Sequence, residues 1–462
     1  MATDEPRFGH VTREDLALFT DLYELAMLQG YRASGHEPEA TFSLFVRDLP
    51  PDRGYVVAAG LEQVVAYVEA LTFSDGALDY LADEGFDGDF LDWLDDWAFT
   101  GELRAVPEGT PVFPDEPLLE VTAPITQGQL LETLVINQVG FQSLIATKAA
   151  RMRDVVRREG DGQQLVDFGS RRAHGTDAGV KAARAAYLGG FAGTSNVAAG
   201  RLFDIPVFGT MAHSWIQSFP TERAAFEAFV DVYGEDSILL IDTYDTERGA
   251  RLAREVAEDR DVTIRGVRID SGDLAAVSRD VDAIVGDDID VFVSSGVDEH
   301  LLADFFDRDG TAAGFGPGTS LVTSDDAPKL ESVYKLVAVD EDGDGDAEPT
   351  MKLSAGKTTY PGEKQLYRVA DGDGYSHDVL ARRDADPGVD GEPLLETVIA
   401  DGDRVAELPD LDAIASRADR EVPRIPDGVR AIRDPDDYPV RVHDGLERLA
   451  DELAEELGER HG

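Results

Sequence analysis

Short apolar runs alternate with helical segments between residues 165 and 316. Seven of these runs end in glycine or in polar side chains and are predicted to be strands, at 165–169, 189–194, 205–210, 237–245, 262–270, 289–296 and 312–316. Helical segments such as 246–257 and 298–306 separate them. This alternation predicts parallel strands joined by right-handed crossovers. Seven such strands favour a closed or nearly closed α/β barrel over a short open sheet.

The chain before this region has mixed periodicity. Residues 16–31 and 61–71 have the helical spacing of apolar positions, and residues 41–46 alternate as in a strand. Short strands with many prolines between 102 and 121 indicate a small β-rich unit. A long helix is predicted from about 127 to 158.

Beyond Thr323 the periodicity changes again. Residues 333–339 and 366–369 alternate like antiparallel strands, and residues 445–457 predict an amphipathic helix. The chain is therefore expected to form four parts, namely an N-terminal α+β domain at 1–125, a catalytic α/β barrel at 126–325, a β-rich segment at 326–400 that rejoins the N-terminal domain, and an acidic helical tail at 401–462.

The composition is that of an ordinary globular protein, with 42% hydrophobic residues among 462. No apolar run approaches the roughly 20 residues that a membrane span requires. The polar, acidic first residues lack the basic start and apolar centre of a signal peptide. Because there is no cysteine, disulfides and thiolate metal sites are excluded. We expect a cytoplasmic protein without a membrane partner.

The chain is strongly acidic, with 93 acidic and 42 basic residues and a formal charge of −51. The acidic residues are spread along the whole chain, which is typical of a solvated acidic surface. Proteins from halophiles have this character, so we expect a salt-loving source. Nucleic acid is not an expected partner, because phosphate backbones require a basic footprint.

One segment departs from this trend. Between Thr147 and Arg184, nine basic residues stand against five acidic ones. A local positive region in an acidic protein is consistent with a pocket for an anionic substrate. Basic helix faces that pair with acidic residues elsewhere explain it equally well.

Glycines and polar residues gather where the predicted strands end. Gly169, Gly193 and Gly209 close three of the strands, and glycine lets backbone N–H groups approach an anion. The carboxyl ends of barrel strands are where such folds place their chemistry. The polar side chains at these ends are Arg171, Ser195, His213, Asp242, Arg268, Asp270, Asp273, Ser294 and Thr319.

Several of these residues suit an anionic ligand. Arginine offers a rigid fork to carboxylate or phosphate, so the pair at 171–172 fits such a ligand, although structural ion pairing would explain it too. His213 is a candidate catalyst, with a structural histidine as the alternative. Asp270 and Asp273 are candidate Mg²⁺ ligands bridging phosphates. Helix capping by Asp270 or Ser271 is the competing interpretation.

The chain lacks a Walker phosphate loop, an H-E-x-x-H helix and a G-x-S-x-G elbow. Their absence disfavours nucleotide hydrolases of that type, zincins and serine hydrolases. The residues alone indicate an α/β-barrel enzyme that acts on a phosphorylated, anionic small molecule. A barrel lyase or aldolase for sugar phosphates and a non-catalytic metabolite-binding protein remain as alternatives.

Seven stretches resemble the nicotinate phosphoribosyltransferase family, in the order in which the family has them. They are FTDLYELAM (19–27), FGSRRAHG (168–175), YLGGFAGTSNVAAG (187–200), PVFGTMAHSW (206–215), GVRIDSGDL (266–274), FGPGTSLVT (315–323) and VYKLV (333–337). Each stretch alone is weak evidence, whereas the ordered set is highly specific. The resemblance extends over about residues 19–368, and the tail after about residue 372 lies outside it.

This resemblance implies a type II phosphoribosyltransferase fold, in which an irregular α/β barrel joins a β-rich domain built from both ends of the chain. It also implies a homodimer with active sites at the subunit interface. The reaction would join nicotinate to 5-phosphoribosyl 1-pyrophosphate, giving nicotinate mononucleotide and pyrophosphate in NAD salvage. ATP hydrolysis and Mg²⁺ would assist it.

The resemblance also implies roles for individual residues. His213 matches a histidine that ATP phosphorylates transiently, and Tyr23 matches a tyrosine that reaches nicotinate from the neighbouring subunit. Thr210 and Arg268 match nicotinate contacts, and Thr319 matches a contact to the ribose pyrophosphate. Two further roles are implied, with Arg171 facing the substrate anions and Phe168 stacking on the pyridine ring.

Ser195 bears on the choice of pyridine. The related nicotinamide enzyme has an acidic residue at this position, which accepts a hydrogen bond from the amide of nicotinamide. An acidic residue would repel a carboxylate, whereas serine tolerates it, so Ser195 favours nicotinate over nicotinamide. Quinolinate ranks third, because its enzyme would not need the histidine motif.

Overall fold

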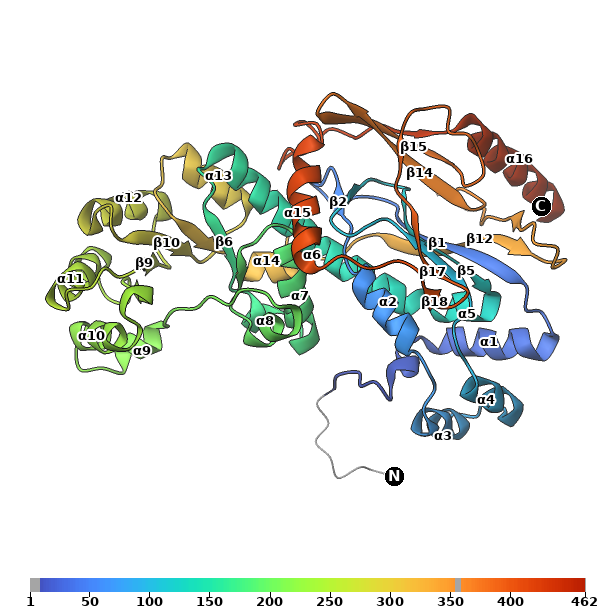
Figure 1. Ribbon diagram of the computed structural model, residues 1–462, viewed down its shortest axis with the longest axis horizontal. Helices are drawn as coiled ribbons and strands as arrows, with labels where there is room; N and C mark the ends of the chain where they lie inside the picture. The colour runs from blue at the N-terminus through green and yellow to red at the C-terminus, as the bar shows by residue number, and fades with distance from the viewer. Residues whose placement is uncertain (1–8, 354–358, 462) are drawn as a thin grey trace. The chain divides into compact units, whose positions relative to one another are not determined.

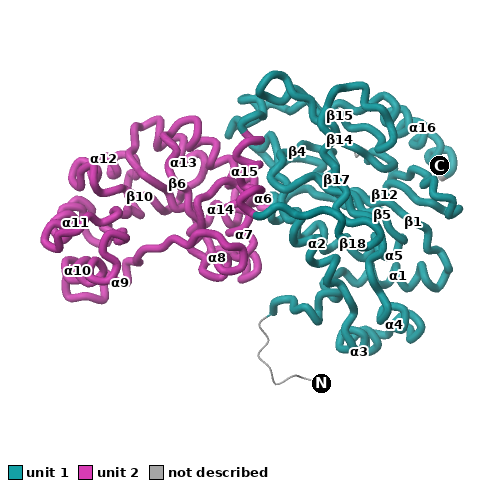
Figure 2. The backbone as a smooth tube through the Cα atoms, viewed as in Figure 1, with its two compact units in different colours: residues 1–144, 329–410, 423–462 teal, residues 145–328, 411–422 magenta. Residues whose placement is uncertain are grey.

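The computed structural model describes residues 9–353 and 359–461. The chain forms two compact units, which Figure 2 distinguishes by colour. Unit 1 comprises residues 1–144, 329–410 and 423–462, and unit 2 comprises residues 145–328 and 411–422. The boundary falls within helix α6 (Glu132–Glu159), after Leu144. The two units are described separately below.

Unit 1 is built on a sheet in which, among the described residues, seven strands follow the order β13-β12-β1-β5-β3-β17-β18 (Figure 1). Its strands are β1 (Glu39–Val46), β3 (Glu102–Ala105), β5 (Pro117–Pro124), β12 (Ser332–Asp340), β13 (Glu348–Pro349), β17 (Glu396–Ala400) and β18 (Asp403–Arg404). β1 pairs antiparallel with β5 on one side and with β12 on the other. Strands from both ends of the chain therefore share one sheet.

The helices of unit 1 and its two smaller sheets complete this part of the fold. The helices are α1 (Leu22–Ser34), α2 (Leu61–Ala70), α3 (Asp75–Asp83), α4 (Gly88–Asp95), α5 (Ile125–Leu130) and α16 (Asp444–His461), with the first part of α6. Strands β2 (Val56–Val57) and β4 (Pro111–Val112) pair together in one small sheet. The other sheet has the order β16 (Glu392–Pro393), β14 (Lys364–Asp371), β15 (Gly374–Arg382) and β19 (Val440–Val442).

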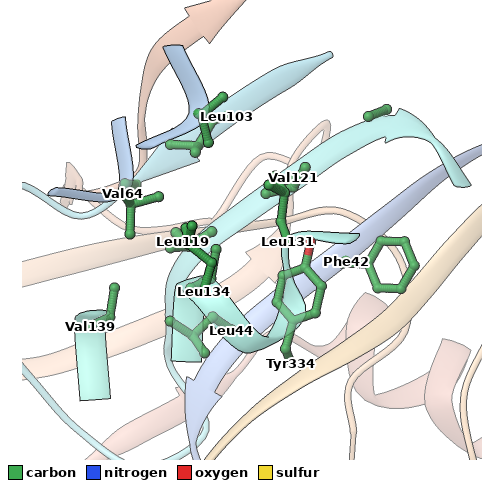
Figure 3. Close-up of a cluster of buried hydrophobic side chains, with 14 of the residues drawn as sticks. Phe42, Leu44, Val64, Leu103, Leu119, Val121, Leu131, Leu134, Val139 and Tyr334 are labelled. Carbon is green, nitrogen blue, oxygen red and sulfur yellow. The ribbon is translucent and has the colours of Figure 1, made fainter. Parts of the chain in front are cut away.

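The core of unit 1 lies between the large sheet and the helices α2, α5 and α6. Figure 3 shows apolar side chains from these elements meeting, with Tyr334 of β12 beside Phe42 of β1. The two rings stack with their centroids 5.0 Å apart, and the Tyr334 hydroxyl donates to the carbonyl oxygen of Gly128 at 2.9 Å. Burial of each such side chain contributes about 1.5–3 kcal/mol relative to its exposure. This core joins residues more than 200 positions apart.

Unit 2 contains a parallel sheet in which the described residues give the order β7-β6-β11-β10-β9-β8. Its strands are β6 (Gln164–Asp167), β7 (Gly193–Thr194), β8 (Ile238–Leu240), β9 (Gly266–Ile269), β10 (Asp290–Ser294) and β11 (Gly314–Gly316). Every pairing between neighbours is parallel, so all carboxyl ends lie at one edge.

Helices connect these strands, and the last two of those named next come after the final strand of the sheet. They are α7 (Thr176–Leu188), α8 (Val197–Phe203), α9 (His213–Gln217), α10 (Glu222–Tyr233), α11 (Thr246–Asp259), α12 (Leu274–Val285), α13 (Glu299–Asp307), α14 (Thr319–Thr323) and α15 (Leu411–Glu421). Three of these helices, α11, α12 and α13, have an aspartate as their N-cap. The side chains of Asp245, Asp273 and Asp298 each accept a hydrogen bond from the backbone N–H three residues later.

Three predicted elements differ from the structure. The predicted strand 205–210 forms a single parallel bridge, between Val207 and Thr194. The long helix is divided at Leu131 into α5 and α6. Between β7 and β8 the described residues form no ladder, so the closed barrel is not established; a hydrogen bond from the Thr210 hydroxyl to the carbonyl oxygen of Ile238 at 2.6 Å spans that gap.

The predicted domain limits also differ from the compact units. The barrel was expected to begin at 126, but residues 126–144 belong to unit 1, because the first turns of α6 pack into its core. The tail predicted at 401–462 is divided, with α15 in unit 2 and residues 423–462 in unit 1. Within the described chain, no helix combines the length and the apolar character needed to cross a bilayer.

A buried network of charged side chains links neighbouring strands of the β16-β14-β15-β19 sheet in unit 1. Arg368 of β14 donates to Asp378 of β15 from Nε at 3.0 Å and from Nη2 at 2.6 Å, and the Tyr438 hydroxyl donates to the same carboxylate at 3.1 Å. Glu116 accepts from the N–H of Phe113 at 2.8 Å through Oε2, whereas its buried Oε1 has no hydrogen-bond partner among the residues that the structure describes. Burial, reinforced by the charge of Asp378, raises the pKa of Glu116 well above its usual value.

Substituting Glu116→Gln is expected to stabilise the protein increasingly as the pH rises. A raised carboxyl pKa means that the folded state holds a proton that the unfolded state loses above about pH 4.5, so wild-type stability falls as the pH rises from there toward the folded pKa. Glutamine carries no charge and can donate to Asp378. Calorimetric melting temperatures at pH 5 and pH 8 would test this, with exposed Glu407→Gln as the control; an equal difference at both pH values would contradict it.

Candidate active site

A cavity of about 520 Å³ lies against the strands of unit 2. Its wall includes residues from both ends of the strands, from Gln164 and Gly314 at amino ends to Phe168 and Gly316 at carboxyl ends. The segment 207–210 also lines the cavity, as do Phe229 and Tyr233 of α10. The cavity is therefore formed by the parallel strands together with this segment and α10.

Glycines at inward positions make room for aromatic rings in this wall. A Cβ on Gly316 would lie 2.4 Å from the ring of Phe168, and one on Gly266 would lie 2.7 Å from the ring of Phe292. Such contacts are far below van der Waals distance, so the rings lie directly against backbone. The hollow interior depends on these glycines, because larger side chains would fill it.

Arg268 supplies positive charge to the cavity. Its guanidinium lies 6.0 Å from the ring centroid of Phe168, and Nη2 donates to the carbonyl oxygen of Met211 at 3.1 Å. Nε is buried and has no hydrogen-bond partner among the described residues. Burial lowers the pKa of Arg268, whereas the carboxylates of Asp270 and Asp242 raise it. A planar anion lying against the side chains of Arg268 and Phe168 would meet a positive charge and an aromatic ring together.

His213 lies at the carboxyl edge of the sheet, at the start of α9. Its Nδ1 is 3.1 Å from the hydroxyl oxygen of Thr243, which follows β8. Its Nε2 is 3.7 Å from Oδ2 of Asp270, which follows β9. The side chain is 41% exposed, so the ring is held by two strand ends and remains accessible to a ligand.

Two carboxylates beside His213 are oriented by short hydrogen bonds. Asp242 accepts through Oδ2 from the N–H of Asp270 at 2.8 Å and from the hydroxyl of Ser271 at 2.6 Å, and its buried Oδ1 has no partner in the described part of the chain. Asp270 accepts from the hydroxyl of Ser294 at 3.1 Å through Oδ1. An unpaired buried carboxylate oxygen next to a second carboxylate fits a divalent cation.

Comparison with known proteins identifies the family. Three family models match: the nicotinate phosphoribosyltransferase N-terminal domain over residues 18–140, the nicotinate phosphoribosyltransferase family over 163–343, and the nicotinate phosphoribosyltransferase C-terminal domain over 387–450. The chain belongs to the nicotinate phosphoribosyltransferase family. The third match also places the acidic tail within the family, although the resemblance read from sequence ended before it.

Individual relatives cover nearly the whole chain. A nicotinate phosphoribosyltransferase of Mycobacterium tuberculosis is 44% identical over 449 residues, covering 95% of this chain and 93% of the relative. One of Bacillus subtilis is 42% identical, covering 77% and 74% of the two chains. The solved structure of human nicotinic acid phosphoribosyltransferase matches with a TM-score of 0.81 at 29% identity, covering 94% of this chain and 99% of that one.

The residues predicted from this family resemblance fall into three groups in the structure. Phe168, Thr210 and Arg268 line the cavity. Arg171, Ser195, His213, Asp270 and Thr319 lie at the carboxyl ends of the strands of unit 2, outside the described cavity wall. Tyr23 belongs to unit 1, where it is 47% exposed on α1. Partial burial, with the charges of Glu132 and Glu24, raises the pKa of Tyr23.

Asp273 is placed differently from Asp270. Its Oδ1 accepts from the N–H of Ala276 and caps α12, and its Oδ2 pairs with Arg308. Hydrogen bonding to Arg308 lowers the pKa of Asp273. Both oxygens therefore have protein partners, and the cap of this helix is Asp273, not Asp270 or Ser271 as the competing interpretation held.

Most of the positive region between Thr147 and Arg184 consists of ion pairs within unit 2. The buried pair Lys148 and Arg151 contacts Glu299 at 2.7 and 2.9 Å. Arg153, Arg157, Arg158 and Lys181 also contact carboxylates. Arg171 makes no ion pair among the described residues, and it acts electrostatically on Arg268. The structure thus separates these structural cations from Arg171 and Arg172, which are both exposed.

Sequence reasoning assigned no role to Asp167, Asp242 or Thr243. The buried carboxylate of Asp167 accepts from the N–H of Gly169 and from the hydroxyl of Thr194, both at 2.7 Å, and so ties the ends of β6 and β7 together. Burial raises the pKa of Asp167. Asp242 was visible only as a polar residue at a strand end, and Thr243 was not singled out. Their roles depend on the neighbours that the fold brings to them.

Substituting Gly316→Ala is expected to lower the free energy of unfolding by about 1–3 kcal/mol, because the new Cβ collides with the Phe168 ring. In a Phe168→Ala background the same substitution should cost little, since its three nearest contacts all belong to that ring. Urea unfolding of the four proteins measures this cycle. Gly458→Ala, which meets nothing within 4 Å, is the control. Equal costs in both backgrounds would show that Phe168 is not the obstacle.

Proposed function

We propose that this protein joins nicotinate to 5-phosphoribosyl 1-pyrophosphate, releasing nicotinate mononucleotide and pyrophosphate in NAD salvage. The observation that carries the proposal is the cavity whose wall holds both Arg268 and Phe168, with the guanidinium 6.0 Å from the ring centroid. A pyridine carboxylate combines the planar ring and the negative charge that this pair would bind.

The strand ends suit the second substrate. Cleavage of the bond to pyrophosphate leaves positive charge on the ribose and builds negative charge on the leaving group. Arg171 and the backbone N–H groups before Thr319 would bind the phosphates. Mg²⁺, held by Asp242 and Asp270, would neutralise charge on the pyrophosphate. The nicotinate nitrogen is itself a nucleophile, so no strong base is required.

ATP would be coupled through His213. The exposed ring beside Asp270 can accept a phosphoryl group, and a phosphate there would add about two negative charges at the mouth of the site. That charge would favour a closed arrangement of the site, with dephosphorylation linked to pyrophosphate release. Asp273 is less suited to the metal than Asp242, because Arg308 and α12 already occupy its oxygens.

The proposal includes a barrel and a dimer. The bridge at Val207 and the hydrogen bond from Thr210 to Ile238 extend the sheet of unit 2 toward closure between β7 and β8. Tyr23 is exposed on unit 1 beside exposed Leu22 and Met27, as expected for an apolar contact between copies. In a homodimer, the partner's copy of this tyrosine would complete the nicotinate site.

Two other activities are weighed against this one. A nicotinamide phosphoribosyltransferase would use the same fold, and Ser195 is the residue that disfavours it. A sugar-phosphate lyase would need a lysine or a metal triad at a strand end. No lysine occurs in the described cavity wall, and Lys148 and Lys181 of unit 2 are paired with carboxylates.

The substrate is tested by offering nicotinate, nicotinamide and quinolinate separately with phosphoribosyl pyrophosphate and Mg²⁺, with and without ATP, across a series of potassium chloride concentrations. Nicotinate alone is expected to give a mononucleotide, faster with ATP and best at high salt. His213→Ala should remove the ATP stimulation. Product from another pyridine would overturn the substrate assignment, and no product from any of them would favour the lyase.

Substituting Ser195→Asp is expected to lower the ratio of nicotinate to nicotinamide turnover by about tenfold or more, because a fixed negative charge opposes a carboxylate. Ser195→Asn has similar size without the charge and serves as the matched control. The ratio of kcat/KM values for the two pyridines is the measurement. If aspartate and asparagine changed it equally, charge at this position would not select the substrate.

A further inference from the structure

Asn196 lies between β7 and α8, and its side chain makes hydrogen bonds with both ends of its amide. Oδ1 accepts from the backbone N–H groups of Ala198 and Ala199 at 3.1 and 3.2 Å. Nδ2 donates to the hydroxyl oxygen of Ser170 at 3.0 Å and to the carbonyl oxygen of Gly179 at 3.2 Å. Because a backbone N–H only donates and a carbonyl oxygen only accepts, these partners fix the orientation of the amide. One side chain thus joins the start of α8 to the turn after β6 and to α7.

The same residue closes a network of hydrogen bonds between the ends of β6 and β7. The N–H of Asn196 donates to the hydroxyl oxygen of Thr194 at 3.0 Å. That hydroxyl donates to Oδ2 of Asp167 at 2.7 Å, and Oδ1 of Asp167 accepts from the N–H of Gly169 at 2.7 Å. Ser170 follows in the chain and returns to the Asn196 amide. These five residues form the strand-end network.

The strand-end network frames residues that are proposed to contact the substrates. Phe168, which lines the cavity, lies between two of its members, and Arg171 directly follows another. Ser195 lies between its two members at the end of β7. Asp167 and Thr194 are fully buried, so water does not compete for the hydrogen bonds between them. A change in this network would therefore be transmitted to the site.

The turn that carries Arg171 is a single 3-10 turn, Ser170–Arg172. The N–H of Arg172 donates to the carbonyl oxygen of Gly169 at 2.7 Å. The N–H of Ala173 donates to the carbonyl oxygen of Ser170 at 3.4 Å, which is at the long end of the hydrogen-bond range. Ordering a mobile segment when a ligand binds is unfavourable, and a turn that is already anchored avoids that cost.

We propose that Asn196 is a positioning residue that anchors the turn of Arg171 for the phosphates of phosphoribosyl pyrophosphate. This inference rests on the proposed function and adds to it the residue that orders the phosphate site before the substrate binds. Asn196 acts through Ser170, to which its Nδ2 donates. Capping of α8 uses only Oδ1, so the two contacts of Nδ2 are the part that this role explains.

Two variants remove the anchor from opposite sides. Asn196→Ser keeps an oxygen that can cap α8 but loses the amide that donates to Ser170. Ser170→Ala removes the acceptor and leaves the cap in place. Each is expected to raise the KM for phosphoribosyl pyrophosphate by about 10- to 100-fold, because a displacement of about 1 Å can cost the larger factor. The double variant should cost no more than either single one, since both remove the same contact.

Steady-state kinetics with each substrate varied in turn measures these effects. Asn137→Ser, the same change at an exposed position of α6, is the matched control and should leave both KM values unchanged. Loss of folded enzyme would lower kcat without changing KM, so a purely structural role for Asn196 predicts that result instead. An unchanged KM in Asn196→Ser, or costs that add in the double variant, would overturn the inference.

Hydrogen exchange in the ligand-free protein tests the anchor without the reaction. Amide protons of the segment 169–173 should exchange about tenfold faster or more in Asn196→Ser than in the wild type, because the turn opens more often. Asn137→Ser should exchange there as the wild type does. Equal exchange in all three proteins would overturn the inference. If the wild type forms no mononucleotide, the proposed function fails, and the exchange measurement still decides whether Asn196 orders the turn.

Discussion

The site of unit 2 depends on keeping a partly buried guanidinium beside the cavity of a parallel sheet. Taking a charged group out of water is unfavourable unless other groups interact with it. Here Asp242 and Asp270 act on Arg268 through their charges, the carbonyl oxygen of Met211 accepts from it, and the Phe168 ring lies over it. Its buried Nε has no hydrogen-bond partner among the described residues. The proposed binding of an anion would use this positive charge.

The cavity of unit 2 also depends on how side chains pack against the sheet. A parallel sheet with covered faces normally fills its interior with branched apolar side chains. In this chain glycines replace several of them, and aromatic rings lie against the exposed backbone, as Phe168 does at Gly316. The rings remove water from the cavity wall without filling the space. Glycine in these strands therefore lets an aromatic ring lie directly against the backbone beside the cavity.

Acidic residues at the strand ends divide into two roles that sequence spacing does not distinguish. Asp245, Asp273 and Asp298 cap the helices that follow, so their carboxylates satisfy free backbone N–H groups. Asp242 and Asp270 precede the caps by about three residues and turn toward His213 and Arg268 instead. The division follows from helix geometry, because only the residue at the cap position can reach the first free N–H groups.

The sequence by itself determined the family, the alternation of strands and helices, and the set of strand-end residues, because local periodicity and ordered motifs depend only on neighbouring positions. Tertiary structure decided how those residues pair. It assigned Asp273 to a cap, Lys148 and Arg151 to a buried ion pair, and Thr243 to the ring of His213. The contacts of Thr243 with His213 and of Arg151 with Glu299 join positions 30 and 148 residues apart, and no local pattern encodes which distant positions meet. It also reduced the strand expected at 205–210 to one bridge, since apolar character alone does not supply a pairing partner.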